Sequence, residues 1–384
     1  MKRRLVILTE IISPYRIPLF NALAQHEEVD LHVIFLAETD PTLRAWHVYK
    51  NEIRFSYEIL PSWRKRFGRY NWLLNRGVGR ALSKSAPEVI LCGGYNYVAS
   101  WQSLMWARVH KVPFFLWSES NAGDLRRGHV LVELLKTAFL GRCSGFVVPG
   151  QPAREYLEVQ KNVKDEAIFT APNAVDNDLF ARLAAAARRD APQLCKSLDL
   201  PERYFLFVGR LVREKGVFEL ISAYATLDEP VRRHVGLVFV GDGVCRGQLE
   251  ERAASISPGV IRFAGFAQRE QLATYYALAE MLVLPTYADT WGLVVNEAMA
   301  CGLPVILSKA AGCGPDLLKE NWNGVLVPPR DVASLVSAMR NLADQPELCA
   351  TMGANSAQHI LQYSPKEWSS GVARLVEARA GGRD

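Results

Sequence analysis

The sequence lacks any long apolar run, since none of its uninterrupted hydrophobic stretches approaches the ~18 residues that a membrane-spanning helix needs. It also lacks low-complexity segments and internal repeats of solenoid period. Its seven cysteines are scattered, odd in number and without a CxxC pair, which argues against a zinc site and predicts a reducing compartment. The basic N-terminus precedes an apolar patch, but Glu10 and Pro14 interrupt that patch. We therefore interpret it as a first buried strand and not as a signal peptide.

The pattern that is present is an alternation of short apolar runs with helical segments over 384 residues, a length that predicts two domains. Runs rich in β-branched residues between helices predict parallel sheets buried on both faces. In the first half the candidate strands are residues 4–8, 30–36, 55–60, 88–93, 113–117, 145–150 and 167–172. In the second half they are residues 204–209, 235–241, 261–265, 281–286, 304–308 and 324–329. The fold class is therefore α/β, with two doubly wound Rossmann-like domains.

The boundary between these domains is expected just after residues 170–180. We assign residues 1–175 to the first domain, 176–360 to the second, and 361–384 to a C-terminal segment. That segment has the pattern of an amphipathic helix, which leaves open whether it packs back on the first domain.

Charge is unevenly distributed along the chain. Residues 1–175 carry 23 Lys and Arg against 16 Asp and Glu, whereas the remainder carries 22 against 24. The excess is concentrated in residues 63–84, which hold seven basic residues and no acid. Apolar side chains are interleaved with the cations there, namely Trp63, Phe67, Tyr70, Trp72, Leu73 and Leu74. Two interpretations stay open: a surface for anionic lipid or a phosphorylated acceptor, or a solvated helix face with Trp and Leu in the core.

Two strand-to-helix loops of the second half carry the chemistry. Asp289 lies in the loop after residues 281–286, and Glu297 follows with seven residues between them, about two turns into a helix. Arg210 and Lys215 follow the strand at 204–208, with Gly209 and Gly216 beside them. Doubly wound sheets bind ligands at such loops, where helix N-termini offer free N–H groups. Two cations there suit a diphosphate, the alternative being an ordinary loop with surface cations.

Two weaker motifs are assigned to structure. Gly241, Gly243 and Gly247 resemble the dinucleotide fingerprint, but the spacing is one residue too long and no acidic ribose ligand follows, so a tight turn is favoured over NAD binding. Asp176 and Asp178 form a D-x-D pair at the expected domain boundary, where a turn with Asx capping is favoured over a metal site.

These residues resemble a known family. The segments GRLVREKG, PNAVDNDLF, VGDG and DTWGLVVNEAMACGLPVI occur in the order seen in glycosyltransferase family 4, and ISPYRIPLFNAL resembles the opening of bacterial members that build surface polysaccharides. The resemblance covers nearly the whole chain. It implies the GT-B fold, with two Rossmann-like domains facing across a cleft, and a retaining transfer without a metal or other cofactor. The expected donor is a nucleotide-sugar, a UDP-sugar or a GDP-sugar.

The resemblance also implies roles for residues. Arg210 and Lys215 would hold the diphosphate, Glu297 the ribose, and Asp289 the sugar. The residues expected to bind the donor are Gly209, Arg210, Lys215, Gly265, Phe266, Asp289, Thr290, Trp291, Gly292, Leu293 and Glu297. Gly265 and Phe266 stand where the family places the nucleobase, and the loop from Thr290 to Leu293 would present backbone N–H groups.

The sequence departs from the family pattern at two places. The family usually has Glu where this chain has Asp289, which is one methylene, roughly 1.5 Å, shorter. Many members carry a His after the strand at 113–117, where this chain has Glu119 between Ser118 and Ser120. Glu119 is assigned with Asp289, Arg210 and Lys215 to catalysis.

The acceptor half of the site is expected in the first domain. Its candidate residues are Tyr15, Arg16, Tyr95 and Asn96. The function predicted is sugar transfer to a lipid-linked or saccharide acceptor in bacterial polysaccharide assembly, in the cytoplasm or at the inner face of the cell membrane, with no nucleic-acid partner. The alternatives are a non-catalytic nucleotide-sugar binder or another GT-B enzyme, such as a sugar-nucleotide epimerase.

Overall fold

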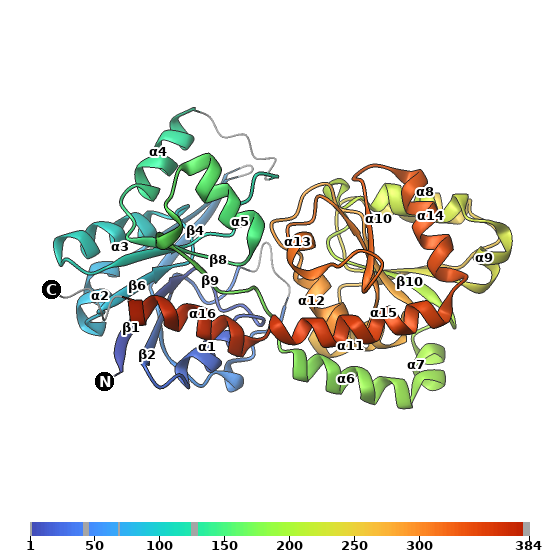
Figure 1. Cartoon of the computed structure of the whole chain (residues 1–384), viewed down its shortest axis with the longest axis horizontal. Coiled ribbons are helices and arrows are strands. Elements are labelled where there is room, and N and C mark those ends of the chain that lie inside the picture. Colours follow the sequence, from blue (N-terminus) through green and yellow to red (C-terminus); the bar gives the residue numbers. More distant parts are fainter. Residues whose placement is uncertain (1, 41–45, 68–69, 124–129, 379–384) are drawn as a thin grey trace. The chain divides into compact units, whose positions relative to one another are not determined.

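Two compact units, each built around its own parallel sheet, make up the computed structural model, which describes residues 2–40, 46–67, 70–123 and 130–378 (Figure 1). Unit 1 takes in the described residues of Met1–Ala122, Arg126–Val175 and Ser364–Asp384. Unit 2 takes in those of Gly123–Leu125 and Asp176–Tyr363. Apart from the short segment Gly123–Leu125, the chain thus leaves unit 1 at Val175 and returns to it at Ser364.

The sheet of unit 1 has seven parallel strands in the order β3-β2-β1-β6-β7-β8-β9. Along the chain these are β1 (Arg3–Thr9), β2 (Val29–Phe35), β3 (Ser56–Ile59), β6 (Val89–Cys92), β7 (Phe114–Trp117), β8 (Gly145–Val148) and β9 (Ile168–Thr170). Its helices are α1 (Ile17–Ala24), α2 (Val78–Ser85), α3 (Val98–Val109), α4 (Val130–Leu140), α5 (Gln151–Glu155) and α16 (Pro365–Ala378). Short helical turns lie at Lys50–Glu52, Tyr156–Gln160 and Asp165–Ala167.

The sheet of unit 2 has six parallel strands in the order β12-β11-β10-β13-β14-β15. These are β10 (Tyr204–Val208), β11 (Gly236–Val240), β12 (Ile261–Gly265), β13 (Met281–Leu284), β14 (Val305–Ser308) and β15 (Gly324–Val327). Its longer helices are α6 (Asn177–Arg189), α8 (Val217–Thr226), α10 (Arg246–Ala254), α11 (Arg269–Leu278), α12 (Leu293–Ala300), α14 (Val332–Ala343) and α15 (Pro346–His359). Shorter ones are α7 (Ala191–Ser197), α9 (Glu229–His234) and α13 (Gly314–Leu317), with turns at Arg213–Lys215 and Ile360–Gln362.

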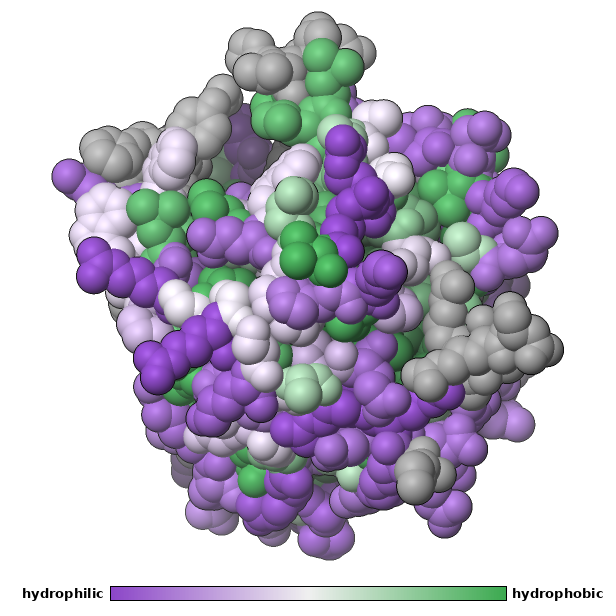
Figure 2. All heavy atoms as spheres, turned by 90° about the vertical axis from the view of Figure 1, so that its left-hand side faces the viewer, coloured by the Kyte–Doolittle hydropathy of each residue, from purple (hydrophilic) through white to green (hydrophobic). Residues whose placement is uncertain are grey.

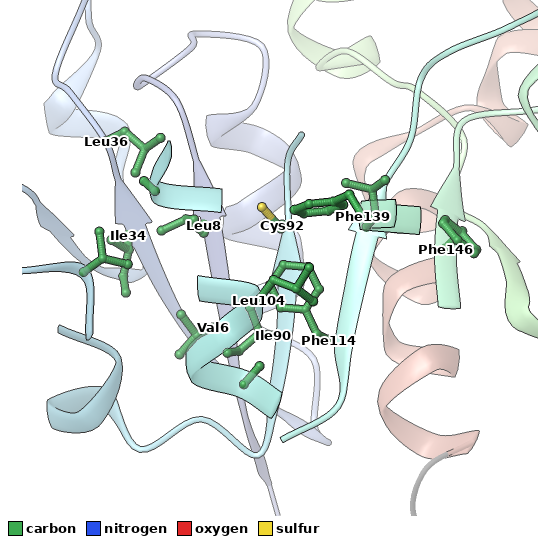
Figure 3. Packing of buried hydrophobic residues seen from close by; sticks show 14 of the residues in the cluster. Val6, Leu8, Ile34, Leu36, Ile90, Cys92, Leu104, Phe114, Phe139 and Phe146 are labelled. Atoms are coloured by element: carbon green, nitrogen blue, oxygen red, sulfur yellow. The ribbon is translucent and has the colours of Figure 1, made fainter. Parts of the chain in front are cut away.

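The prediction of two doubly wound α/β sheets is confirmed, since every strand candidate in the two lists forms a parallel strand. Except in the edge strands β3 and β12, their apolar runs are largely buried on both faces, as helix-covered parallel strands require. In unit 1 one face packs under α2, α3 and α4, with Leu104 and Phe139 against Phe114 and Phe146 (Figure 3). The other face packs under α1 and α16, where Trp368 of α16 contacts Phe20 and Trp117.

The interpretation of residues 63–84 as one helix face is wrong. Residues Ser62–Phe67 form β4, residues Tyr70–Asn75 form β5, and the two pair as an antiparallel hairpin outside the main sheet. The helix α2 begins only at Val78. Neither strand alternates cleanly between apolar and polar residues, since β4 reads SWRKRF and β5 reads YNWLLN.

Candidate functional site

Each sheet has one switch point, where consecutive strands turn from one side of the first strand to the other. In unit 1 this point lies between β1 and β6, and in unit 2 between β10 and β13. Open α/β sheets bind ligands outside the carboxyl ends of the strands at such points. The predicted donor residues of unit 2 follow β10, β12 and β13, so all of them lie at the same edge of one parallel sheet.

An ion pair joins the two loops at the switch point of unit 2. The Lys215 ammonium contacts the Asp289 carboxylate, and both side chains are largely buried. The loops are also tied through Glu214, whose carbonyl accepts hydrogen bonds from the Tyr287 N–H at 2.8 Å and the Thr286 hydroxyl at 3.0 Å. The structure therefore brings together a cation and an acid that the sequence placed 74 residues apart.

Two helices begin at this point with a glycine in left-handed conformation. Gly216 (φ +70°) precedes α8, and Gly292 (φ +99°) precedes α12. A side chain on Gly216 would place its Cβ 2.0 Å from the carbonyl oxygen of Pro285, so only glycine lets the two loops approach this closely. The free N–H groups of both helix starts create positive potential beside Lys215.

Glu297 lies in α12 and accepts a hydrogen bond of 2.8 Å from the Tyr276 hydroxyl of α11. Burial raises the pKa of the Glu297 carboxyl from its ordinary 4.5 to about 7, and the hydrogen bond from Tyr276 acts in the opposite direction. Glu297 is thus a carboxyl whose charge changes near neutral pH, and its acceptor capacity changes with it.

The loop between Asp289 and α12 is fixed from within. The Trp291 indole is 3% exposed and donates its N–H to the Asn296 side chain at 2.8 Å. Its backbone N–H points to the Asp289 carboxylate at 3.4 Å, and the backbone of Asp289 accepts from Gly312 at 2.9 Å. The Trp291 indole is therefore a packing group, and a donor-binding role for this residue is confined to its backbone. Thr290 is exposed and Leu293 half-buried.

The remaining donor candidates lie at the ends of β10 and β12. Arg210 is exposed directly after Gly209, and Phe266 is exposed directly after Gly265.

Gly241 and Gly243 have a structural role at the loops after β10 and β11. A Cβ on Gly241 would lie 1.9 Å from the Gly209 carbonyl oxygen, so these glycines allow close packing of the loops after β10 and β11, as the tight-turn interpretation expects.

In unit 1, Arg16 and Glu119 meet at the carboxyl edge of the sheet. The Arg16 guanidinium lies 3.8 Å from the Glu119 carboxylate and 4.5 Å above the Trp117 ring. It also donates to the Thr9 hydroxyl at 2.6 Å. A planar cation held over an aromatic face, with a carboxylate beside it, can orient a hydroxyl or an anionic group.

The other acceptor candidates are more dispersed. Tyr15 packs edge-on against Trp46 at 5.5 Å. Tyr95 packs against Phe139 and lies 5.6 Å from the Lys136 ammonium of α4, while Asn96 is exposed.

A cluster of charged groups that sequence reasoning did not assign to the site also lies at this edge. Arg64 of β4 pairs with Asp40, whose carboxylate is almost fully buried, and lies 3.4 Å from Glu10, the residue after β1. Burial and a hydrogen bond to Glu10 raise the pKa of Tyr97 well above its usual range. The signal for Glu10 was present, since an acid directly after a buried strand is unusual. The four residues come from separate segments, so their meeting was not predictable.

Among the residues that the structure describes, no three His, Cys, Asp or Glu side chains are grouped to hold a metal ion. Asp176 of the D-x-D pair caps α6 by accepting from the Leu179 N–H at 2.9 Å, which confirms the capping interpretation. No helix in the described part of the chain is both long and apolar enough to cross a bilayer.

Comparison with known proteins matches residues 196–359 to the family described as glycosyl transferases group 1. A D-inositol 3-phosphate glycosyltransferase of Streptomyces coelicolor is 34% identical over 206 residues, which cover 51% of this chain and 43% of that protein. The chain spans about half the length of the curated relatives it matches.

Two solved structures cover nearly all of the chain. Sucrose-phosphate synthase from Thermosynechococcus elongatus has a TM-score of 0.75 at 20% identity, with 100% of both chains covered. Anabaena HepE in complex with UDP has a TM-score of 0.76 at 17% identity, with 98% of this chain and 100% of that one covered, and it is also solved with UDP-glucose. Because both structures align with nearly the whole chain, the similarity in fold includes unit 1 as well as unit 2. Residues 196–359 are thus similar to the group 1 glycosyl transferases, and the whole chain has the GT-B fold of these solved structures.

Proposed function

We propose that the chain is a retaining, metal-independent glycosyltransferase that moves a hexose or related sugar from a nucleotide-sugar to a lipid-linked or saccharide acceptor in bacterial polysaccharide or glycoconjugate assembly. The observation that carries this proposal is the Lys215–Asp289 ion pair at the switch point of unit 2. It lies beside the starts of α8 and α12. The match of this half of the chain to the group 1 family supports it.

The chemistry of donor cleavage is consistent with this arrangement. When a nucleoside diphosphate leaves the sugar, negative charge gathers on its phosphates. Lys215, the exposed Arg210 and the N–H groups that begin α8 and α12 are positioned to stabilise that charge in place of a metal.

Binding of the donor would separate the ion pair between Lys215 and Asp289. The diphosphate would share the Lys215 ammonium, and the Asp289 carboxylate would then accept hydrogen bonds from sugar hydroxyls. In this proposal the shorter Asp is tolerated because the backbone of its loop is fixed through Gly312 and through the Lys215 contact.

The rest of the donor has its own partners. Glu297 would accept the ribose hydroxyls, and the exposed ring of Phe266 at the end of β12 offers a face for the nucleobase. A uracil base is favoured because HepE, which shares the fold, is solved with UDP and with UDP-glucose.

Unit 1 would bind the acceptor, with Arg16 and Glu119 orienting its reacting hydroxyl and Tyr15, Tyr95 and Asn96 around it. Attack on the face from which the diphosphate departs would retain the anomeric configuration, with the leaving phosphate taking the proton. No protein nucleophile is needed. The reaction would take place in the cytoplasm, at the inner face of the cell membrane where the acceptor is lipid-linked.

The test is a thermal-shift screen of the purified chain against UDP-, GDP-, ADP- and CMP-sugars and the free nucleotides. A ligand that binds the folded state raises its melting temperature by mass action. We expect a shift with one nucleotide family that is lost in Arg210→Ala and in Glu297→Ala. Arg213→Ala is the matched control because this exposed cation lies in the same loop and packs on Phe218. No shift with any nucleotide, or equal shifts in all variants, would overturn the donor assignment.

A non-catalytic nucleotide-sugar binder is the second candidate, since Asp289 replaces the family's Glu and is held by Lys215. Transfer of labelled sugar to an acceptor by the purified chain would exclude it. Conversion of the donor sugar without any acceptor would instead indicate an epimerase.

A further inference from the structure

The hairpin β4–β5 has two chemically different faces. In its register Trp63 lies opposite Leu74, and Lys65 lies opposite Trp72. Residues directly opposite share a face, and neighbours along a strand alternate between faces. Trp63, Lys65, Trp72 and Leu74 therefore lie on one face, and Arg64 and Leu73 lie on the other.

The inner face anchors the hairpin to unit 1. Leu73 is 2% exposed and belongs to the core under α2 and α3. Arg64 pairs with the buried Asp40, and the Asn75 side chain donates to the Leu36 carbonyl at 2.5 Å. Arg64 is thus a structural cation that cannot also serve a partner at the surface.

The outer face, by contrast, presents large aromatic side chains to solvent. Trp63 is 54% exposed and Trp72 53%, with the exposed Leu74 and Lys65 between them. A two-stranded hairpin whose inner side is this firmly packed does not need exposed indoles for its own stability. Exposed apolar groups gathered in this way mark an interaction surface.

Neighbouring helices of the same layer extend this apolar character. β5 packs on α3, and α3 contacts α4 through Trp101 and Phe139 at a ring distance of 5.0 Å. The exposed large apolar residues of these two helices are Val98, Met105 and Val109 of α3 and Val132, Leu134 and Leu135 of α4. On the face of the molecule shown in Figure 2, apolar side chains lie among strongly hydrophilic ones.

Most charged residues of the same layer are basic. Between Trp63 and Lys111 the only acid is Glu88, and α4 adds Glu133, whose carboxylate pairs with Lys161 at 3.1 Å. The exposed cations described there are Lys65, Arg76, Arg80, Lys84, Arg108 and Lys111. Exposed Trp, aliphatic side chains and an excess of Lys and Arg over acids are the combination that binds the headgroup region of anionic bilayers.

We propose that the outer face of the hairpin β4–β5, together with the exposed residues of α3 and α4, docks unit 1 on an anionic lipid bilayer. This surface stands on unit 1 alone, so it holds or fails independently of the donor chemistry in unit 2. On the inner face, Arg64 contacts Glu10 directly after β1, at the edge where the acceptor candidates lie. Docking would therefore bring that edge to a membrane-borne acceptor.

The test is flotation of the full chain with vesicles of phosphatidylcholine alone and of equal parts phosphatidylcholine and phosphatidylglycerol, at low and physiological salt. We expect binding to the anionic vesicles only. Trp63→Ser with Trp72→Ser should weaken it by about tenfold or more. Val244→Ser with Leu361→Ser is the matched control, because these exposed apolar residues lie in unit 2.

Charge is tested separately with Lys65→Gln, Arg76→Gln and Arg80→Gln in one variant. It should weaken binding and flatten its salt dependence, whereas Arg182→Gln, Arg189→Gln and Lys196→Gln in unit 2 should not. All variants should keep the nucleotide-induced thermal shift of the unchanged chain, which separates this proposal from the proposed function. Equal vesicle binding by the tryptophan variant, or no binding by the unchanged chain, overturns the proposal. A concentration-dependent dimer that the tryptophan substitutions abolish would overturn it in favour of an interface between copies.

Discussion

The charge state of Glu297 makes nucleotide binding dependent on pH. The carboxyl has a pKa of about 7 because it is buried, and its proposed partners, two ribose hydroxyls, are donors that favour the ionised form. Donor affinity should therefore rise as the pH rises through 7, and binding at lower pH should release a proton.

The free energy of unfolding depends on pH in the opposite direction. Ionisation of a carboxyl with a raised pKa opposes the folded state, so its contribution to stability falls between about pH 4.5 and 7.

The size of the effect follows from the ionised fraction. With a pKa of about 7, this fraction grows from about one tenth at about pH 6 to about nine tenths at about pH 8. If only the ionised form binds, affinity should rise about tenfold over this range, equivalent to about 1.4 kcal/mol.

Titration calorimetry with UDP-glucose at a series of pH values measures this directly. The sugar nucleotide is preferable to UDP, whose terminal phosphate itself titrates near pH 6. Glu297→Gln should bind more weakly with a flat pH profile. Tyr276→Phe is the sharper control: loss of the hydroxyl that lowers the pKa of Glu297 should move the midpoint to higher pH. If the unchanged chain and Glu297→Gln share one pH profile, Glu297 does not bind the ribose as an ionised acceptor.

Three further predictions concern stability and binding. Gly216→Ala should lower the free energy of unfolding by at least about 2 kcal/mol in urea denaturation, because its Cβ would meet the Pro285 carbonyl. Gly247→Ala is the control, since Gly247 has open space around it in the exposed first turn of α10. This substitution should raise the free energy of unfolding by about 0.5–1 kcal/mol. Arg64→Met should cost about 3 kcal/mol in the same assay, because it leaves the buried Asp40 carboxylate without its guanidinium, and an unchanged midpoint would contradict the anchoring role. Lys215→Met should weaken UDP binding in calorimetry by about 1.5–3 kcal/mol through loss of a charge-assisted hydrogen bond, and unaltered affinity would remove Lys215 from the phosphate site.

Most of the parallel strands were predictable because they are short apolar runs that are buried on both faces, whereas the edge strands β3 and β12 are partly exposed. The hairpin was not, because one of its inward residues is Arg64. A cation that points inward interrupts the alternation of apolar and polar residues by which a strand is recognised. The burial of Arg64 depends on Asp40, which lies 24 residues earlier in the chain.

The candidate site shows the same limit. Lys215 and Asp289 could each be singled out from a local motif, but only the sheet order brings their loops together. Glu297 was found through its spacing from Asp289, yet its raised pKa comes from burial against Tyr276 of another helix. Trp291 is the converse case, since a bulky residue in a predicted donor loop turned out to bond Asn296 in the interior.

The return of the chain to unit 1 in α16 also has a consequence for synthesis on the ribosome. The face of the first sheet that Trp368 covers is made from residues before Val175, and α16 begins only at Pro365, about 190 residues later. At a synthesis rate of roughly 5–20 residues per second, α16 is made roughly 10–40 s after the sheet face that it covers. During this interval the nascent chain exposes Leu5, Phe20 and Trp117, which makes it a client for chaperones, while nearly all of unit 2 comes from the single segment Asp176–Tyr363 and can fold as that segment emerges.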